Sequence, residues 1–159
     1  MNDTLVKELR EKASRLKREA SRLKREEGNL VGALETRLKL ELIYDSFDSD
    51  VILKDNNLCQ IANLAVHVGQ FSEAERAARK SVSLTLPLDD KRRANSLSLL
   101  SAVLAESGKF EEAVIYGEQS VKLRESLFGA DSSYVKYRKA DLQRMYEKDT
   151  DPNGTVACY

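Results

Sequence analysis

One short pattern occurs three times along this chain of 159 residues and constrains its fold more than any other feature. Each copy begins with glycine, has leucine or phenylalanine two positions later, and has alanine five positions later. The copies begin at Gly28, Gly69 and Gly108, so they are 41 and 39 residues apart. A period of this length is typical of repeat proteins, in which each repeat is one small supersecondary unit.

The pattern has a physical reason, because a helix-length segment precedes and follows each glycine. Glycine can end the first helix by adopting a left-handed backbone conformation without a Cβ clash. We expect the apolar residue after it to pack back across the turn, and the small alanine to let the second helix approach the first. Upstream of the second glycine, apolar residues recur at helical spacing, at Leu58, Ile61, Ala62 and Ala65. Each repeat is therefore predicted to be a helical hairpin with one apolar side that stacks on its neighbours.

The same periodicity predicts an all-α chain of seven helices. They are expected at about 3–27, 30–46, 53–68, 71–85, 90–107, 110–126 and 132–147. The seventh segment has many charges on one side, which suits a cap that ends the stack. We expect a single domain over residues 1–148 and a flexible tail at 149–159, where acidic residues, proline and Asn-Gly follow one another.

The best-formed copy of the repeat is SLLSAVLAESGKFEEAVIYGEQSVKLRESLFGADSSYV, residues 98–135. This segment resembles the tetratricopeptide repeat, and it is most similar to the longer repeat of the kinesin-light-chain type. The resemblance implies a short right-handed α-solenoid of about three hairpins, at about 13–46, 53–88 and 90–130, followed by the cap. Ser132-Ser133 stands where this type of repeat has His-Pro, and the first copy is degenerate because Leu30 replaces the aromatic residue.

In this family, the first helices of successive repeats line a concave groove that holds an extended peptide or a helix of another protein. The resemblance therefore implies partner-binding positions at fixed offsets from the three turn glycines. These positions are Arg15, Arg18, Arg22, Arg25, Asn56, Cys59, Asn63, His67, Asn95, Ser98, Ala102 and Glu106. Asparagine offers a donor and an acceptor to a peptide backbone, and arginine favours a carboxylate. The expected partner is a protein segment, with acidic groups as one option.

Each of these residues also has a structural interpretation. The arginines suit ion pairs on a solvated helix face, and the asparagines suit capping or simple exposure. His67 lies where it can contact the carbonyls at the end of its helix, and Cys59 suits a small core position. The carboxylate clamp of co-chaperone members is not expected, because the fifth helix supplies no cation at the matching positions. Those positions are Arg18, Arg22, Gln60, Asn95 and Leu99.

Residues 13–26 repeat ASRLKRE twice, and Leu9, Leu16 and Leu23 lie seven residues apart. These leucines can form a short coiled-coil seam, or they can pack on the second helix of the first hairpin. Because alanine buries little area at the alternate positions, we favour the second interpretation. Self-assembly through this helix, or through an exposed repeat end, is the alternative function. The basic residues are interspersed with acids and lack interleaved aromatics, so nucleic-acid binding is not expected.

The composition favours an interaction protein over an enzyme. Lys plus Arg and Asp plus Glu both total 26, so no global field attracts a charged polymer. No stretch approaches 18 uncharged apolar residues, so we expect a cytoplasmic chain that does not bind membranes. A single histidine and two well-separated cysteines make no metal motif, and no phosphate-binding loop or nucleophile elbow is present. We therefore expect no cofactor, no metal and no catalytic residue.

Overall fold

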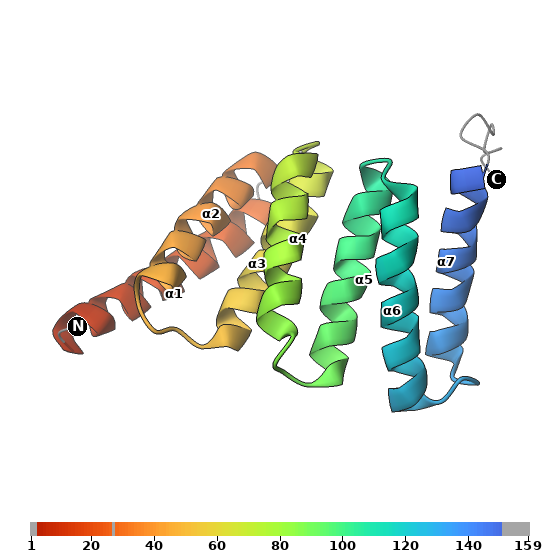
Figure 1. Ribbon diagram of the computed structural model, residues 1–159. Coiled ribbons are helices and arrows are strands. Elements are labelled where there is room, and N and C mark those ends of the chain that lie inside the picture. The colour runs from red at the N-terminus through yellow and green to blue at the C-terminus, as the bar shows by residue number, and fades with distance from the viewer. Residues whose placement is uncertain (1–2, 27, 151–159) are drawn as a thin grey trace. The chain divides into compact units, whose positions relative to one another are not determined.

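The computed structural model describes residues 3–26 and 28–150, and every regular element in these ranges is an α-helix (Figure 1). The helices are α1 (Asp3–Arg25), α2 (Leu30–Ser46), α3 (Val51–His67), α4 (Phe71–Thr85), α5 (Asp90–Glu106), α6 (Phe110–Phe128) and α7 (Ser133–Thr150). The predicted boundaries lie within two residues of these, except at the end of α7. That helix continues through Thr150, so the tail predicted from residue 149 begins later than expected. The rest of the predicted tail, 151–159, lies outside the described residues.

The chain divides into two compact units, Met1–Leu84 and Thr85–Tyr159. In the N-terminal unit, α1 packs on α2 and α2 packs on α3. In the C-terminal unit, α5 packs on α6 and α6 packs on α7. Helices that follow one another in sequence are thus neighbours in space within each unit, as expected for hairpins joined by short turns.

The turns after α3 and α5 have the same construction, which the glycine pattern predicted. Gly69 and Gly108 have φ angles of +76° and +79°. After α3, the Gln70 N–H bonds to the Ala65 C=O at 2.8 Å, and the equivalent bond after α5 measures 2.9 Å. These bonds satisfy carbonyls that the end of a helix would leave unpaired. The left-handed glycine is therefore what allows each hairpin to turn sharply.

The alanine five positions after each glycine is fully buried in its hairpin. Ala33, Ala74 and Ala113 are all 0% exposed. In the third hairpin, the Ser101 hydroxyl donates a hydrogen bond to the Ala113 C=O at 2.7 Å, which links α5 to α6 at this alanine. Phe71 remains 38% exposed, so the apolar residue after Gly69 covers its turn only in part.

The apolar stripe of α1 packs on α2, which confirms the favoured interpretation of the duplicated heptads. Ala20 is buried, and the leucines of the heptads lie half-buried against the hairpin. The cluster between the two helices consists of Ala13, Leu40, Ile43, Tyr44 and Phe47, with Val6, Leu9 and Leu16 packed against it. The apolar residues of the heptads thus pack within the first hairpin, against α2.

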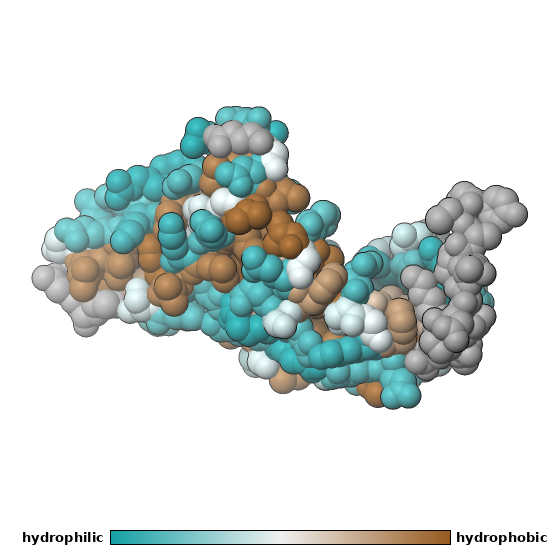
Figure 2. Space-filling model, turned by 90° about the horizontal axis from the view of Figure 1, so that it is seen from above, coloured by the Kyte–Doolittle hydropathy of each residue, from teal (hydrophilic) through white to brown (hydrophobic). Residues whose placement is uncertain are grey.

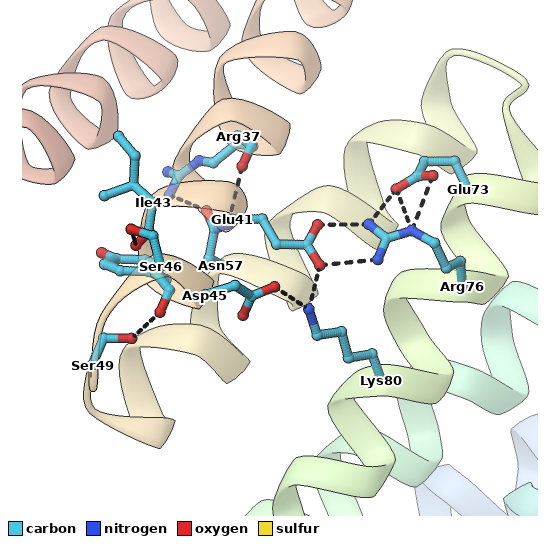
Figure 3. A network of polar contacts seen from close by, with 11 residues as sticks. Arg37, Glu41, Ile43, Asp45, Ser46, Ser49, Asn57, Glu73, Arg76 and Lys80 are labelled. Atoms are coloured by element: carbon cyan, nitrogen blue, oxygen red, sulfur yellow. Dashed lines mark hydrogen bonds and ion pairs between the residues drawn. The ribbon is translucent and has the colours of Figure 1, made fainter.

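Ion pairs join the second helices of the first two hairpins, α2 and α4 (Figure 3). Glu41 is 8% exposed and accepts two hydrogen bonds from the Arg76 guanidinium, at 2.9 and 2.6 Å. Lys80 donates to Glu41 at 2.8 Å and to Asp45 at 2.6 Å. Burial acts to raise the pKa of Glu41, but the hydrogen bonds from Arg76 and Lys80 outweigh it, and the pKa is lower than usual. This network fixes how one hairpin sits on the next.

We predict that Gly108→Ala lowers the free energy of unfolding by about 1–2 kcal/mol. An added Cβ meets no atom within 4 Å, so the whole cost comes from the left-handed backbone and none from a clash. Gly108→Asn is the matched control, because asparagine tolerates this conformation better and should lose less. Urea unfolding followed by helical circular dichroism measures both. Equal stability of all three proteins would show that the turn does not depend on glycine.

A second prediction concerns pH. Glu41→Gln should lower the free energy of unfolding at neutral pH by on the order of 1–3 kcal/mol, because Arg76 and Lys80 lose their buried partner. A carboxyl whose pKa is lowered by folding stabilises the fold above its unfolded pKa, and this stability is lost as the pH falls through the folded pKa. The gap between variant and wild type should therefore close below the ordinary carboxyl value of 4.5. Urea titrations above and below that pH measure the gap, and a gap independent of pH would contradict the assignment.

Candidate functional site

The four arginines predicted as partner-binding residues on α1 all lie on its exposed side. Arg15 and Arg18 line a shallow hollow of about 560 Å³. The other residues around it are Lys7, Arg10, Glu11 and Ser14. Four cations and one acid therefore surround this hollow, so it carries a positive potential. Arg22 and Arg25 lie further along the same helix, outside the hollow, and the Arg25 Nε donates to the Ser21 C=O at 3.4 Å.

Three of the four predicted positions on α3 are also exposed. Asn56, Asn63 and His67 are separated by seven and four residues, so they project from the same side of the helix. The His67 Nδ1 makes a hydrogen bond of 2.6 Å with the Asn63 C=O. His67 therefore contacts a carbonyl near the end of its own helix, as the structural interpretation of this residue proposed. The exposed side chains of Asn56 and Asn63 remain available to a partner.

Cys59, on the same helix, faces its own hairpin. Its sulfur lies 3.9 Å from Asp55 Oδ1 and 3.8 Å from the Ser81 hydroxyl on α4. Ser81 donates to Asp55 at 2.5 Å, so the three residues link α3 to α4. Burial, with the nearby negative charge of Asp55, raises the pKa of the Cys59 thiol to about 11. The thiol is therefore protonated at neutral pH and has a packing role rather than a nucleophilic one.

In the C-terminal unit, a buried arginine of α6 donates hydrogen bonds to two of the four predicted residues of α5. Arg124 is 2% exposed, and its Nη2 donates to Asn95 Oδ1 at 3.2 Å and to the Ser98 hydroxyl at 3.0 Å. Its remaining contacts are to the Ala94 C=O, the Ser120 hydroxyl and the Tyr134 hydroxyl. All these acceptors are neutral, and burial lowers the pKa of Arg124. No motif in the sequence marks this arginine, which the sequence interpretation missed.

A hollow of about 400 Å³ opens between α5 and α7 in the same unit. The apolar side chains around it are Ala102, Ala105, Phe110 and Met145, and the charged ones are Glu106, Asp141 and Arg144. Ala102 and Glu106 are two of the positions that the repeat offset implied. The residues from α7 were missed, because the sequence suggested only a capping role for that helix.

The geometry of this hollow suits a side chain from a partner. Its volume falls within the range of known binding pockets, which combine an apolar lining with a few polar groups that set orientation. On its rim, Arg144 pairs with Asp141 at 2.5 Å. A smaller hollow of about 110 Å³ adjoins it, shares Ala102, Asp141 and Met145, and extends to Ser98 and Arg138. In the described part of the chain, no group of histidine, cysteine or acidic residues is arranged to hold a metal ion.

Residues 54–126 match the family model of the tetratricopeptide repeat. Among solved structures, the chain is similar to nearly identical TPR-like repeats from Podosopora anserina, described as those of a kinesin light chain. Two crystal structures of those repeats, one of them carrying a single substitution, each give a TM-score of 0.71 at 18% identity. Each alignment covers 91% of this chain and 68% of the other. No curated protein matches the chain at a significant level.

These similarities define the class of the fold: the chain is all-α, its residues 54–126 match the tetratricopeptide repeat, and the predicted family resemblance and the predicted fold class are both confirmed. The match covers the second and third hairpins, which carry the clearest copies of the glycine pattern. Tetratricopeptide repeats are in general protein–protein interaction modules, and this fold is typically a non-enzymatic scaffold. None of the helices in the described ranges is long and apolar enough to span a bilayer.

Proposed function

We propose that this protein is a non-enzymatic adaptor that binds a peptide or a helix of another protein with the first helices of its repeats. The observation that supports this most is the hollow of about 400 Å³ between α5 and α7. It combines an apolar floor with charged groups of both signs, as the centre and rim of a protein interface do. Two of its residues, Ala102 and Glu106, occupy positions that bind partners in other proteins with this repeat.

The chemistry of the lining defines the kind of segment that fits. Phe110 and Met145 offer contacts to a large apolar side chain, and Met adapts to varied shapes. Glu106 is exposed at the rim, where it can accept a hydrogen bond from a partner's backbone or cation. In the N-terminal unit, the exposed amides of Asn56 and Asn63 provide further contacts to a backbone.

The positive hollow of α1 extends the proposal to acidic partners. Arg15 and Arg18 lie beside Lys7 and Arg10, and Glu11 is the one acid of the lining. A partner segment rich in Asp or Glu would bind there through charge-assisted hydrogen bonds, which arginine forms in a bidentate geometry. Because the site is exposed, its contribution to affinity should weaken as salt rises.

We predict that Ala102→Gln weakens partner binding at least tenfold, since the longer side chain fills the hollow from an exposed position and leaves the core intact. Ala140→Gln is the matched control, because Ala140 is also an exposed alanine within a helix, on α7 and outside the hollow. The purified full chain captures partners, which are identified by mass spectrometry, and calorimetry then compares the three proteins with one identified segment. Equal affinities would exclude the hollow as the binding site.

A second function, self-association, is favoured by an exposed apolar stripe on α2, in the N-terminal unit. Val31 and Leu42 are 51% and 71% exposed and lie on one side of α2, with half-buried Leu38 between them. Figure 2 shows that hydrophobic residues reach the surface over the N-terminal half of the chain, beside hydrophilic ones. Polar and charged residues dominate the exposed side of α7 instead, including Lys136, Lys139, Gln143 and Glu147.

The occupant that this stripe fits is a second copy of the chain. Glu35 and Lys39 are exposed beside the stripe, four residues apart on α2 and opposite in charge. Two copies related by a twofold axis would bring the same patch together, so that an acid of one copy can meet a base of the other. A partner of one strong charge sign would not be matched by such a mixed border.

Leu42→Glu should therefore keep the full chain monomeric at concentrations where the wild type dimerises, because it places a charge at the most exposed residue of the apolar stripe. Sedimentation equilibrium over a range of concentrations measures this. Ile115→Glu is the control, since Ile115 is 53% exposed on α6 in the other unit. If the wild type is monomeric at every concentration measured, self-association is excluded as a function.

A further inference from the structure

A further hollow, of about 370 Å³, opens in the N-terminal unit, and neither function proposed above uses it. Its lining comes from α1, the end of α2, the loop at 47–50 and the first turn of α3. Three of the lining residues, Ala13, Tyr44 and Phe47, are buried members of the cluster between α1 and α2. Leu53 is 40% exposed, so it offers an apolar surface that a ligand can reach. The volume lies within the range of known binding pockets.

The loop between α2 and α3 gives this hollow its acids. Three aspartates occur in the stretch DSFDSD, which ends at Asp50. Asp45 pairs with Lys80 at 2.6 Å (Figure 3), whereas Asp48 and Asp50 line the hollow and are exposed. Asp48 forms no ion pair with any other described residue. Asp50 accepts the Ile52 N–H at 2.7 Å through Oδ1, which caps α3 and leaves the second carboxylate oxygen for another donor.

The two acids suit an organic cation. In the part of the chain that the structure describes, they belong to no group of three acidic, histidine or cysteine side chains that could hold a metal ion. The end of α2 adds to the negative potential, because the last carbonyls of a helix carry a partial negative charge and α2 has no basic residue in its last turn. The positive end of α3 lies at the same loop, but the Asp50 carboxylate already caps it.

Arg10 is the one cation of the lining. It lies on the exposed side of α1 and also lines the positive hollow with Arg15 and Arg18. Within the described ranges it pairs with neither Asp48 nor Asp50. The lining therefore contains two carboxylates and one guanidinium, a net charge of −1 (+1 − 2). A ligand that complements it carries positive charge next to an apolar portion.

We propose that this hollow binds a long basic side chain, arginine or lysine, of a partner protein. The aliphatic part of the side chain packs on Leu53, above the buried aromatic rings, and the cationic end binds the carboxylates of Asp48 and Asp50. A purely apolar ligand would leave both acids without a partner, and an acidic one would be repelled by them. The assignment of the occupant to another protein rests on the proposed function, whereas the chemistry of the hollow does not.

The test is an NMR titration of the full chain, observed at the methyl groups of Leu53. The probes are N-acetyl-arginine amide, N-acetyl-citrulline amide, which has the same shape without the charge, and free arginine. We expect saturable shifts with the blocked arginine and at least threefold weaker binding of citrulline. Asp48→Asn and Asp50→Asn should each weaken the blocked arginine by about threefold, and asparagine still caps α3. Glu35→Gln, which removes an exposed acid of α2 outside the hollow, should leave its affinity unchanged.

Three results would overturn the proposal: no saturation by the blocked arginine, equal binding of citrulline, or unchanged affinity in both aspartate variants. Tighter binding of free arginine than of the blocked form would assign the hollow to a small molecule instead of a partner protein. Arg10→Gln removes a competing cation, so the affinity for the blocked arginine should not fall, and a fall would contradict the assigned charge. The titration uses no partner, and Ala102→Gln tests partner binding in the other unit, so either proposal can fail while the other stands.

Discussion

The contact on which the rest of this structure depends is the close approach of two helices at a buried alanine, just after a left-handed glycine. The glycine ends the first helix and satisfies its last carbonyls, and the alanine then allows the second helix to lie directly against the first. In the third hairpin, Ala113 is fully buried and its carbonyl accepts a hydrogen bond from the Ser101 hydroxyl of the facing helix. The conformation of each hairpin therefore depends mainly on residues within that hairpin.

The candidate sites follow from how the helices pack within each unit. In the C-terminal unit, α7 follows α6 as a further first helix, and a hollow forms between it and α5. In the N-terminal unit, the ion pairs of Glu41, Arg76 and Lys80 fix one second helix on the next. The surfaces left for partners are thus those that the stacking contacts do not use.

Much of the fold could be predicted from the sequence, because the glycine pattern and the helical periodicity are local signals. The side chains of the site were harder to predict, and two equivalent positions show why. Cys59 and Ser98 occupy the same offset in successive repeats, and each contacts a serine of its own second helix, Ser81 or Ser120. The offset relates equivalent backbone positions, but the serines on α4 and α6 decide which groups these side chains contact.

By itself, the sequence determined the number of helices, their order, the turns between them and the family of the repeat. Each of these depends on residues close together in the chain, so a pattern of glycines, alanines and apolar positions is sufficient. Tertiary structure alone decided that Arg124 is buried among neutral acceptors and that the Arg138 Nε has no hydrogen-bond partner within the described part of the chain. It also decided that α7 completes a hollow with α5. These properties depend on residues up to some forty positions apart, which no local pattern relates to one another.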